Sequence, residues 1–204
     1  AGCALLYHLA RLGWTDSVLV EKGELTVGST WHAAGNTPHY ATGWTLGRIY
    51  LESTNFYQSF AKETGEDVGF HKCGGVRLSV SKDHEEEHRR AAAKARAQGM
   101  RMEIIGPNQA KDLLPYMNMD GIRSVCWTPD DGYIDPSSIT NALARQARAK
   151  GAEIYRHTRV TGLKRQNGHW RVETEKGTIT SEIVVNAAGL WAREVSAMVG
   201  HHEP

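Results

Sequence analysis

Residues 28–35, with the sequence GSTWHAAG, combine small residues with one large aromatic side chain and one imidazole. Glycine, serine and alanine let a ligand come close to the backbone, whose N–H groups can bind a pyrophosphate. A single histidine is more often a surface residue or a satisfied core residue, but the position of His32 among small neighbours favours a binding role. The residues alone therefore indicate a site for something flat and phosphorylated.

A second pattern with chemical meaning is HEEEH, residues 84–88, which fits the HExxH zinc motif letter for letter. A zinc-binding helix needs a buried face, because its ligands lie in a cleft and their second nitrogens need fixed partners. Here the neighbouring side chains are charged all round, and acids near a helix N-terminus are stabilised by the helix dipole. The sequence therefore predicts an exposed helix start and no metal site.

Composition excludes several classes of protein. The 204 residues include 24 basic and 23 acidic ones, and a net charge of +1 leaves no electrostatic footprint for nucleic acid or a membrane surface. No apolar run approaches the roughly 18 residues that span a bilayer. Cys3, Cys73 and Cys126 are far apart and form no CxxC, so neither a disulfide framework nor a cysteine metal site is expected.

The beginning of the chain has the order of a nucleotide-binding unit. Residues 1–13 have apolar side chains at helical spacing, and residues 16–23 form a short apolar run ending in an acid, typical of a buried parallel strand. Gly2 would be the last glycine of a dinucleotide fingerprint, and Glu21 would be its ribose-binding acid. A helix followed by a strand is also common elsewhere, so both interpretations stay open. In the dinucleotide interpretation the first strand is missing and the sequence is a fragment.

The rest of the chain reads as an α+β segment followed by a second α/β segment. Helices are predicted at 45–62, 83–99, 107–115, 136–151 and 190–200, and strands at 73–81, within 122–136, over 152–180 and at 181–189. Asp135 and Pro136 are typical of a helix N-cap and first turn, and Asn167-Gly168 of a hairpin turn. The predicted organisation is a cofactor domain, residues 1–44 and 136–204, interrupted by a substrate-domain segment, residues 45–135.

Four stretches resemble the flavin-dependent dimethylglycine and sarcosine dehydrogenases, within the D-amino-acid-oxidase-like FAD-dependent oxidoreductases. They are VEKGELTVGSTWHAAG (20–35), TGEDVGFHKCGGVRLS (64–79), DGYIDPSSIT (131–140) and IVVNAAGLWAREV (183–195). The resemblance implies an α/β fold: a Rossmann-like FAD-binding domain of the GR2/DAO type with an inserted α+β substrate domain, truncated at both ends.

The resemblance also implies which residues bind FAD. His32 matches the histidine that bonds covalently to the flavin 8α-methyl group, Glu21 and Lys22 match the pair that contacts the ribose, and Val160 matches a residue whose backbone meets the adenine. The complete predicted set is Gly2, Glu21, Lys22, Gly28, Ser29, Thr30, Trp31, His32, Ala33, Ala34, Gly35, Val160, Ala187, Ala188 and Gly189. No catalytic acid or base and no metal ligand is assigned.

The activity implied is oxidation of an N-methyl amine such as dimethylglycine or sarcosine, with hydride passing from the N-methyl carbon to flavin N5. Tetrahydrofolate is implied only if the full protein has a C-terminal folate domain, and the electron acceptor is either an electron-transfer flavoprotein or oxygen. The expected partners are small molecules, with no nucleic acid and no membrane. The expected location is the cytoplasm in a bacterium or the mitochondrial matrix in a eukaryote.

The sequence leaves two alternatives open. One is a related FAD amine oxidase with another substrate; a glycerol-3-phosphate-type dehydrogenase is disfavoured by the Trp31-His32 pair. The other is a non-catalytic regulatory subunit on the same scaffold. His32 discriminates between enzyme and regulator, because a regulator has no need of a flavin-linking imidazole.

Overall fold

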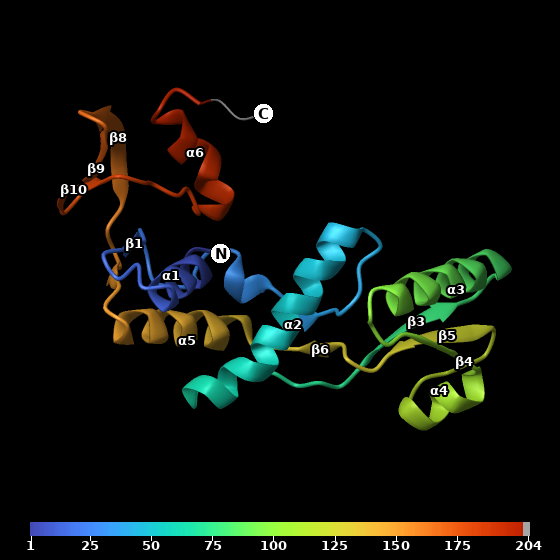
Figure 1. Ribbon diagram of the computed structural model, residues 1–204. Coiled ribbons are helices and arrows are strands. Elements are labelled where there is room, and N and C mark those ends of the chain that lie inside the picture. The colour runs from blue at the N-terminus through green and yellow to red at the C-terminus, as the bar shows by residue number, and fades with distance from the viewer. Residues whose placement is uncertain (202–204) are drawn as a thin grey trace. The chain divides into compact units, whose positions relative to one another are not determined.

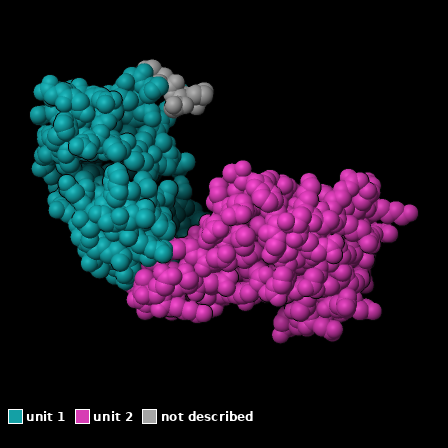
Figure 2. All heavy atoms as spheres, viewed as in Figure 1, with its two compact units in different colours: residues 1–33, 136–204 teal, residues 34–135 magenta. Residues whose placement is uncertain are grey.

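The structure is a computed structural model that describes residues 1–201. Its contacts divide the chain into two compact units: residues 1–33 with 136–204 form unit 1, and residues 34–135 form unit 2 (Figure 2). Residues 202–204, which the sequence assigns to the second part of the cofactor domain, lie outside the described residues.

Unit 1 is built around two helices that pack against each other, α1 (Gly2–Arg11) and α5 (Pro136–Ala149). Their apolar positions recur at helical spacing, so each helix buries one face. The buried side chains include Leu6, Tyr7, Ala10, Ile139, Leu143 and Ala147. Beside them, β1 (Val18–Val20) pairs in parallel with β7 (Glu153–Tyr155), as the order helix–strand predicts for an α/β unit.

The second half of unit 1 contains an antiparallel sheet of β8 (Val160–Gln166), β9 (His169–Thr174) and β10 (Gly177–Ser181), with β9 in the centre. The turn between β8 and β9 has φ values of +52° at Asn167 and +83° at Gly168. Positive φ at both central residues is the geometry that an Asn-Gly hairpin turn favours, so the predicted turn is confirmed.

The predicted buried strand at 181–189 is wrong. β10 ends at Ser181, and residues 182–188 belong to no strand. Ile183 and Val185 are 60% and 58% exposed. An apolar run becomes a strand only when a neighbouring strand pairs with it, and no segment among residues 1–201 pairs with this one. The chain continues into η2 (Gly189–Trp191) and α6 (Ala192–Ala197), which confirms a short helix near the end.

Unit 2 contains a second antiparallel sheet, ordered β3 (Gly75–Ser79), β5 (Ser124–Thr128) and β4 (Glu103–Ile105). The strand β4 was not predicted from sequence. Helix α3 (Lys82–Ala97) lies along this sheet (Figure 1), and α4 (Pro107–Leu113) contacts β5. The core between them consists of Tyr40, Ala92, Ala95, Met100, Met102 and Cys126.

Two further parts of unit 2 are α2 (Trp44–Thr64) and a short antiparallel pair, β2 (Asn36–Thr37) with β6 (Gly132–Tyr133). β2 directly follows residues 28–35, and β6 directly precedes α5 in the sequence. Although α2 is long, no helix in the described part of the chain is both long and apolar enough to span a membrane.

The HEEEH pattern lies at the start of α3. Ser81 is the N-cap, and its hydroxyl accepts a hydrogen bond from the His84 backbone at 3.2 Å. His84 is exposed, whereas the Nδ1 atom of His88 lies 2.7 Å from the Ser79 hydroxyl on β3. Within residues 1–201 no group of three or more His, Cys, Asp and Glu side chains could hold a metal ion. The two histidines therefore have separate roles in the structure.

Candidate functional site

Glu21 lies directly after β1, at the carboxyl end of the parallel pair. Its backbone N–H donates to the Tyr155 carbonyl at 2.9 Å, and its carbonyl accepts from Thr158 at 2.8 Å. The Oε1 atom of its carboxylate accepts from the backbone N–H of Gly23 at 2.8 Å. Since the carboxyl ends of parallel strands are where nucleotides bind, a fixed acid here can accept hydrogen bonds from sugar hydroxyls.

Gly2 begins α1 in close contact with two other segments. A Cβ atom at Gly2 would lie 3.3 Å from Leu19 Cδ1 and 3.6 Å from the Cβ of Ala187. The start of α1 therefore meets both β1 and the predicted second cofactor segment. Burial raises the pKa of the neighbouring Cys3 thiol, and the nearby charge of Glu21 adds to this rise.

The loop 28–35 contains a single turn of 3-10 helix, η1 (Thr30–His32), which packs against α5. The Trp31 N–H donates to the Thr26 carbonyl at 3.3 Å, and the Ala33 N–H to that of Thr30 at 3.2 Å. The rings of Trp31 and His32 lie with their centroids 3.8 Å apart and their planes inclined by 33°. Trp31 therefore packs directly against the imidazole, and both side chains remain exposed.

Lys22 joins the first and last cofactor segments of unit 1. Its Nζ atom lies 3.3 Å from the centroid of the Trp191 ring, a cation–π contact. A Cβ atom at Gly28 would lie 3.5 Å from the same ring. Trp191 was not named among the predicted cofactor residues, although its stretch was. The sequence signal is a large aromatic residue two positions after Gly189, the last of the small residues 187–189.

Asn186 is a second residue that sequence reasoning missed. Its side-chain amide donates to the Ala192 carbonyl at 2.8 Å and to the Ser196 hydroxyl at 3.1 Å, and its oxygen accepts from the Ala188 N–H at 3.2 Å. Gly189 follows with φ +57°, a conformation that favours glycine. Asn186 therefore shapes the turn that carries Ala188 and Gly189.

The other residues predicted to bind the cofactor lie in β8 and in the loop 28–35. Val160 begins β8 opposite Thr174, two residues after the contact of Thr158 with Glu21. Glu24 connects the turn after β1 to the segment before β8, because its carboxylate contacts His157 and Arg156. These hydrogen bonds lower the pKa of Glu24. Ser29, Thr30 and Ala33 lie in the η1 loop of unit 1. Ala34 and Gly35 belong to unit 2, so the structure does not join them to this group.

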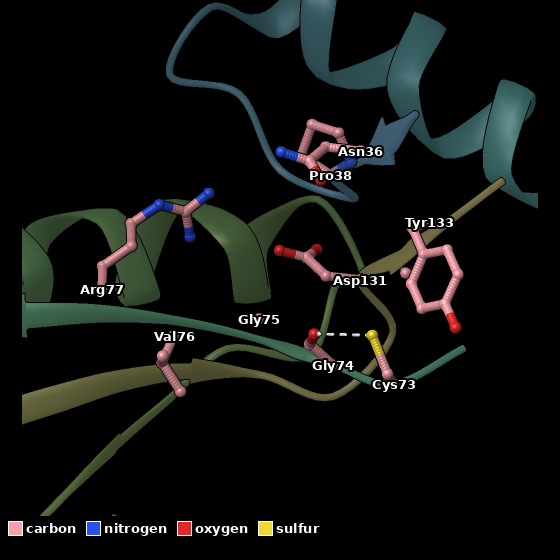
Figure 3. Close-up of a pocket in the computed structure, with 10 residues that line it drawn as sticks. Asn36, Pro38, Cys73, Gly74, Gly75, Val76, Arg77, Asp131 and Tyr133 are labelled. Carbon is pink, nitrogen blue, oxygen red and sulfur yellow. Dashed lines mark hydrogen bonds between the residues drawn. The ribbon is translucent and has the colours of Figure 1, made fainter. Parts of the chain in front are cut away.

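Unit 2 has a pocket of about 330 Å³, lined by residues of β2, β3 and β6 (Figure 3). A carboxylate, a guanidinium and a phenol face it, from Asp131, Arg77 and Tyr133. None of these three was predicted as a site residue. The pocket begins at Asn36, directly after the loop 28–35.

The whole chain, residues 1–204, matches the DAO family, described as FAD dependent oxidoreductase, and the chain belongs to this family. Dimethylglycine dehydrogenase, mitochondrial, of Rattus norvegicus is 43% identical over 204 residues, all of this chain and 24% of the relative. Sarcosine dehydrogenase, mitochondrial, of Homo sapiens is 32% identical over 210 residues, 100% of this chain and 23% of the relative. The chain therefore spans about a quarter of these relatives.

Two more comparisons bear on function and fold. Pyruvate dehydrogenase phosphatase regulatory subunit, mitochondrial, of Mus musculus is 30% identical over 204 residues, 100% of this chain and 23% of the relative. The crystal structure of L-proline dehydrogenase from P. horikoshii superposes with a TM-score of 0.89 at 26% identity, over 97% of this chain and 52% of that one. The predicted fold class, a DAO-type α/β fold with a Rossmann-like cofactor domain, is confirmed.

The residues of unit 1 fit a bound FAD in two respects. A Cβ atom at Gly2 would lie 3.3 Å from Leu19 Cδ1, so glycine permits the close packing of α1 on β1 that a dinucleotide-binding unit requires. The cofactor segments also carry large apolar side chains on the surface, among them Trp31 at 59% and Leu190 at 77% exposure. These exposed apolar side chains are free to contact a flat ring such as that of a flavin.

Proposed function

We propose that this chain is the FAD-binding part of an enzyme that oxidises an N-methyl amine such as dimethylglycine or sarcosine. The proposal rests on membership in the FAD-dependent family and on one structural observation. Lys22 and Gly28 both meet Trp191, so the two cofactor segments predicted from sequence form one surface in unit 1. The similarity to dimethylglycine dehydrogenase supports the choice of substrate class.

Each residue of unit 1 has a defined part in this proposal. Glu21 accepts hydrogen bonds from the ribose hydroxyls, and the backbone at Gly2 and Gly28 approaches the pyrophosphate. His32 would hold the flavin covalently, and Trp31 packs against its ring with the centroids 3.8 Å apart. When bound, FAD supplies the hydride acceptor for oxidation of the N-methyl carbon. The chain's own task is to bind and orient the cofactor.

The finer points of the proposal concern the complete protein. Its electron acceptor is either an electron-transfer flavoprotein or oxygen, and tetrahydrofolate takes part only if a folate domain is present. The two dehydrogenase relatives are mitochondrial proteins, which supports the matrix as the location in a eukaryote; a bacterial protein would be cytoplasmic.

The test is purification of the complete protein, followed by its absorbance spectrum and anaerobic addition of candidate substrates. We expect a flavin spectrum that is bleached by dimethylglycine or sarcosine, with release of formaldehyde. Proline and glycine serve as comparison substrates, since an amine oxidase of another specificity would respond to one of them. A flavoprotein that none of these amines reduces would contradict the proposed activity.

The second candidate is a regulatory subunit without catalysis, which the similarity to the phosphatase regulator supports. A regulator predicts binding to a phosphatase and no flavin bleaching by any amine. The same titration therefore separates the two candidates, because reduction of the flavin by substrate is expected only of the enzyme.

A further inference from the structure

The pocket of unit 2 contains the carboxylate of Asp131, which accepts a hydrogen bond but forms no ion pair within the described residues. Asp131 is 8% exposed, and its Oδ1 atom accepts a hydrogen bond from the His39 backbone at 2.7 Å. The other oxygen, Oδ2, lies 2.6 Å from where a Cβ atom of Gly75 would be. Glycine at position 75 therefore makes room for the carboxylate above β3, and Oδ2 faces the pocket.

A guanidinium faces the same space from the same strand. Successive side chains of a strand point to opposite faces, so Arg77 projects from the face of β3 on which Asp131 lies above Gly75. Figure 3 shows Arg77 and Asp131 on one side of β3 and Val76 on the other. The Nη1 atom of Arg77 donates to the Thr128 hydroxyl at 3.3 Å, and the guanidinium also contacts Cys126 on the neighbouring strand β5. A guanidinium has five N–H donors, so it can still donate to a ligand in the pocket.

The two opposite charges share the pocket without pairing. Within the described part of the chain Arg77 and Asp131 form no ion pair with each other or with another side chain. A largely buried carboxylate without a counter-charge is costly, and two separated charges of opposite sign favour a ligand that supplies both complements. Both charged groups line the same pocket of about 330 Å³, so a small molecule in it can meet both of them.

Tyr133 completes the pocket with an aromatic face. Its ring is 46% exposed and packs against His71, with the ring centroids 4.9 Å apart and the planes inclined by 32°. The backbones of the two residues also pair, the His71 N–H donating to the Tyr133 carbonyl at 2.8 Å. An aromatic ring held in place beside a carboxylate binds methylated ammonium groups through cation–π contacts.

We propose that this pocket binds a small zwitterion with a methylated ammonium and a carboxylate. Asp131 and Tyr133 would receive the ammonium, and Arg77 the carboxylate. The proposal rests on the proposed function, since dimethylglycine and sarcosine are zwitterions of this kind, and it assigns their recognition to three residues of unit 2. The roles are in binding only, and no bond is made or broken by these side chains.

The experiment measures binding without turnover, by isothermal titration of the complete flavin-loaded protein. Glycine betaine is the main probe: its nitrogen has no lone pair, so it cannot be oxidised to an iminium. Choline retains the methylated cation and lacks the carboxylate. The variants are Arg77→Gln, Asp131→Asn and Tyr133→Leu. Arg89→Gln and Asp83→Asn remove the same charges from the exposed surface of α3 and serve as matched controls.

We expect the Kd of betaine to rise at least tenfold in Arg77→Gln and in Asp131→Asn, as for loss of a charge-assisted hydrogen bond. Choline should lose affinity in Asp131→Asn and not in Arg77→Gln. Tyr133→Leu should reduce the preference for betaine over glycine. In Asp131→Asn the amide oxygen can still accept the hydrogen bond from the His39 backbone N–H. Circular dichroism verifies the fold of each variant.

Betaine affinities within twofold of wild type in both charge variants, or no binding of betaine by the wild type, would overturn the assignment of the pocket. A KM for dimethylglycine in Arg77→Gln equal to that of the wild type would also overturn the assignment of the pocket, but it would leave the proposed function intact. Failure of every methylated amine to bleach the wild-type flavin would instead contradict the proposed function. The two failures are therefore distinguishable.

Discussion

The ammonium group of Lys22 lies over the indole ring of Trp191, 3.3 Å from its centroid. The contact connects the turn after β1 to η2, near the other end of the described chain. A Cβ atom at Gly28 would lie 3.5 Å from the same indole ring. One aromatic ring therefore contacts two segments that the sequence assigns to the cofactor.

We predict that Trp191→Leu weakens FAD binding by the apoprotein about two- to fivefold, because a cation–π contact at an exposed site contributes roughly 0.5–1 kcal/mol. Lys22→Met should have an effect of similar size, and the double variant should add little to either. The measurement is titration of apoprotein with FAD, followed by quenching of flavin fluorescence. Trp170→Leu is the control, since Arg165 lies 5.8 Å from its ring in the β8–β9 hairpin. Additive effects of the two variants would contradict the coupling.

Glu21→Gln should weaken noncovalent FAD binding by roughly 1–3 kcal/mol, the contribution of a charge-assisted hydrogen bond to a sugar hydroxyl. The fold should survive, because a glutamine oxygen can still accept from the Gly23 backbone. The measurement is again the FAD titration of the apoprotein. Glu182→Gln, at an exposed position outside the cofactor segments, is the matched control. Unchanged affinity in Glu21→Gln would refute its assignment to the ribose.

His32→Ala should abolish covalent attachment of the flavin and slow turnover without abolishing it. The alanine removes the nitrogen that would bond to the flavin 8α-carbon, whereas the hydride acceptor N5 is unchanged. Flavin fluorescence of the denatured protein in a gel measures attachment. His84→Ala, which alters an exposed histidine of α3, should keep the fluorescent band. A band that persists in His32→Ala would show that another residue carries the bond.

Asp130 should stabilise unit 2 in a pH-dependent way. Hydrogen bonds from Arg101 and then Lys72 hold its pKa well below the ordinary range of an aspartate. Because the folded-state pKa is depressed, the stabilisation is present above the unfolded pKa of about 4 and is lost as the pH falls through lower values. We expect Asp130→Asn to cost about 1–2 kcal/mol at pH 7.

The measurement for Asp130 is hydrogen exchange of amides in residues 124–133 of the complete protein, compared between wild type and Asp130→Asn at each pH. The excess exchange of the variant should be roughly 5- to 30-fold at pH 7 and should shrink between pH 5 and pH 3. Asp120→Asn removes an exposed carboxylate of the same unit and should exchange as the wild type does. A difference that stays constant with pH would exclude the ion pair as its cause.

Local patterns in the sequence determined much of this protein. The apolar spacing in residues 1–13 and 136–151 predicted α1 and α5. Asp135-Pro136 predicted the start of a helix, and Asn167-Gly168 predicted a hairpin turn. Helical period, capping and turn conformation depend on residues close in the chain, so they can be read without tertiary structure. The small residues of the loop 28–35 indicated a cofactor site for the same reason.

Tertiary structure alone decided which distant segments meet. Residues 183–188 are as apolar as a buried strand, yet no described segment pairs with them, because pairing depends on a neighbour and not on composition. Likewise, the residues around Trp191 in the sequence do not predict its contact with Lys22. The residues around Gly75 do not predict its contact with the carboxylate of Asp131. These contacts join residues far apart along the chain, and only the packing of whole elements brings them within a few ångströms.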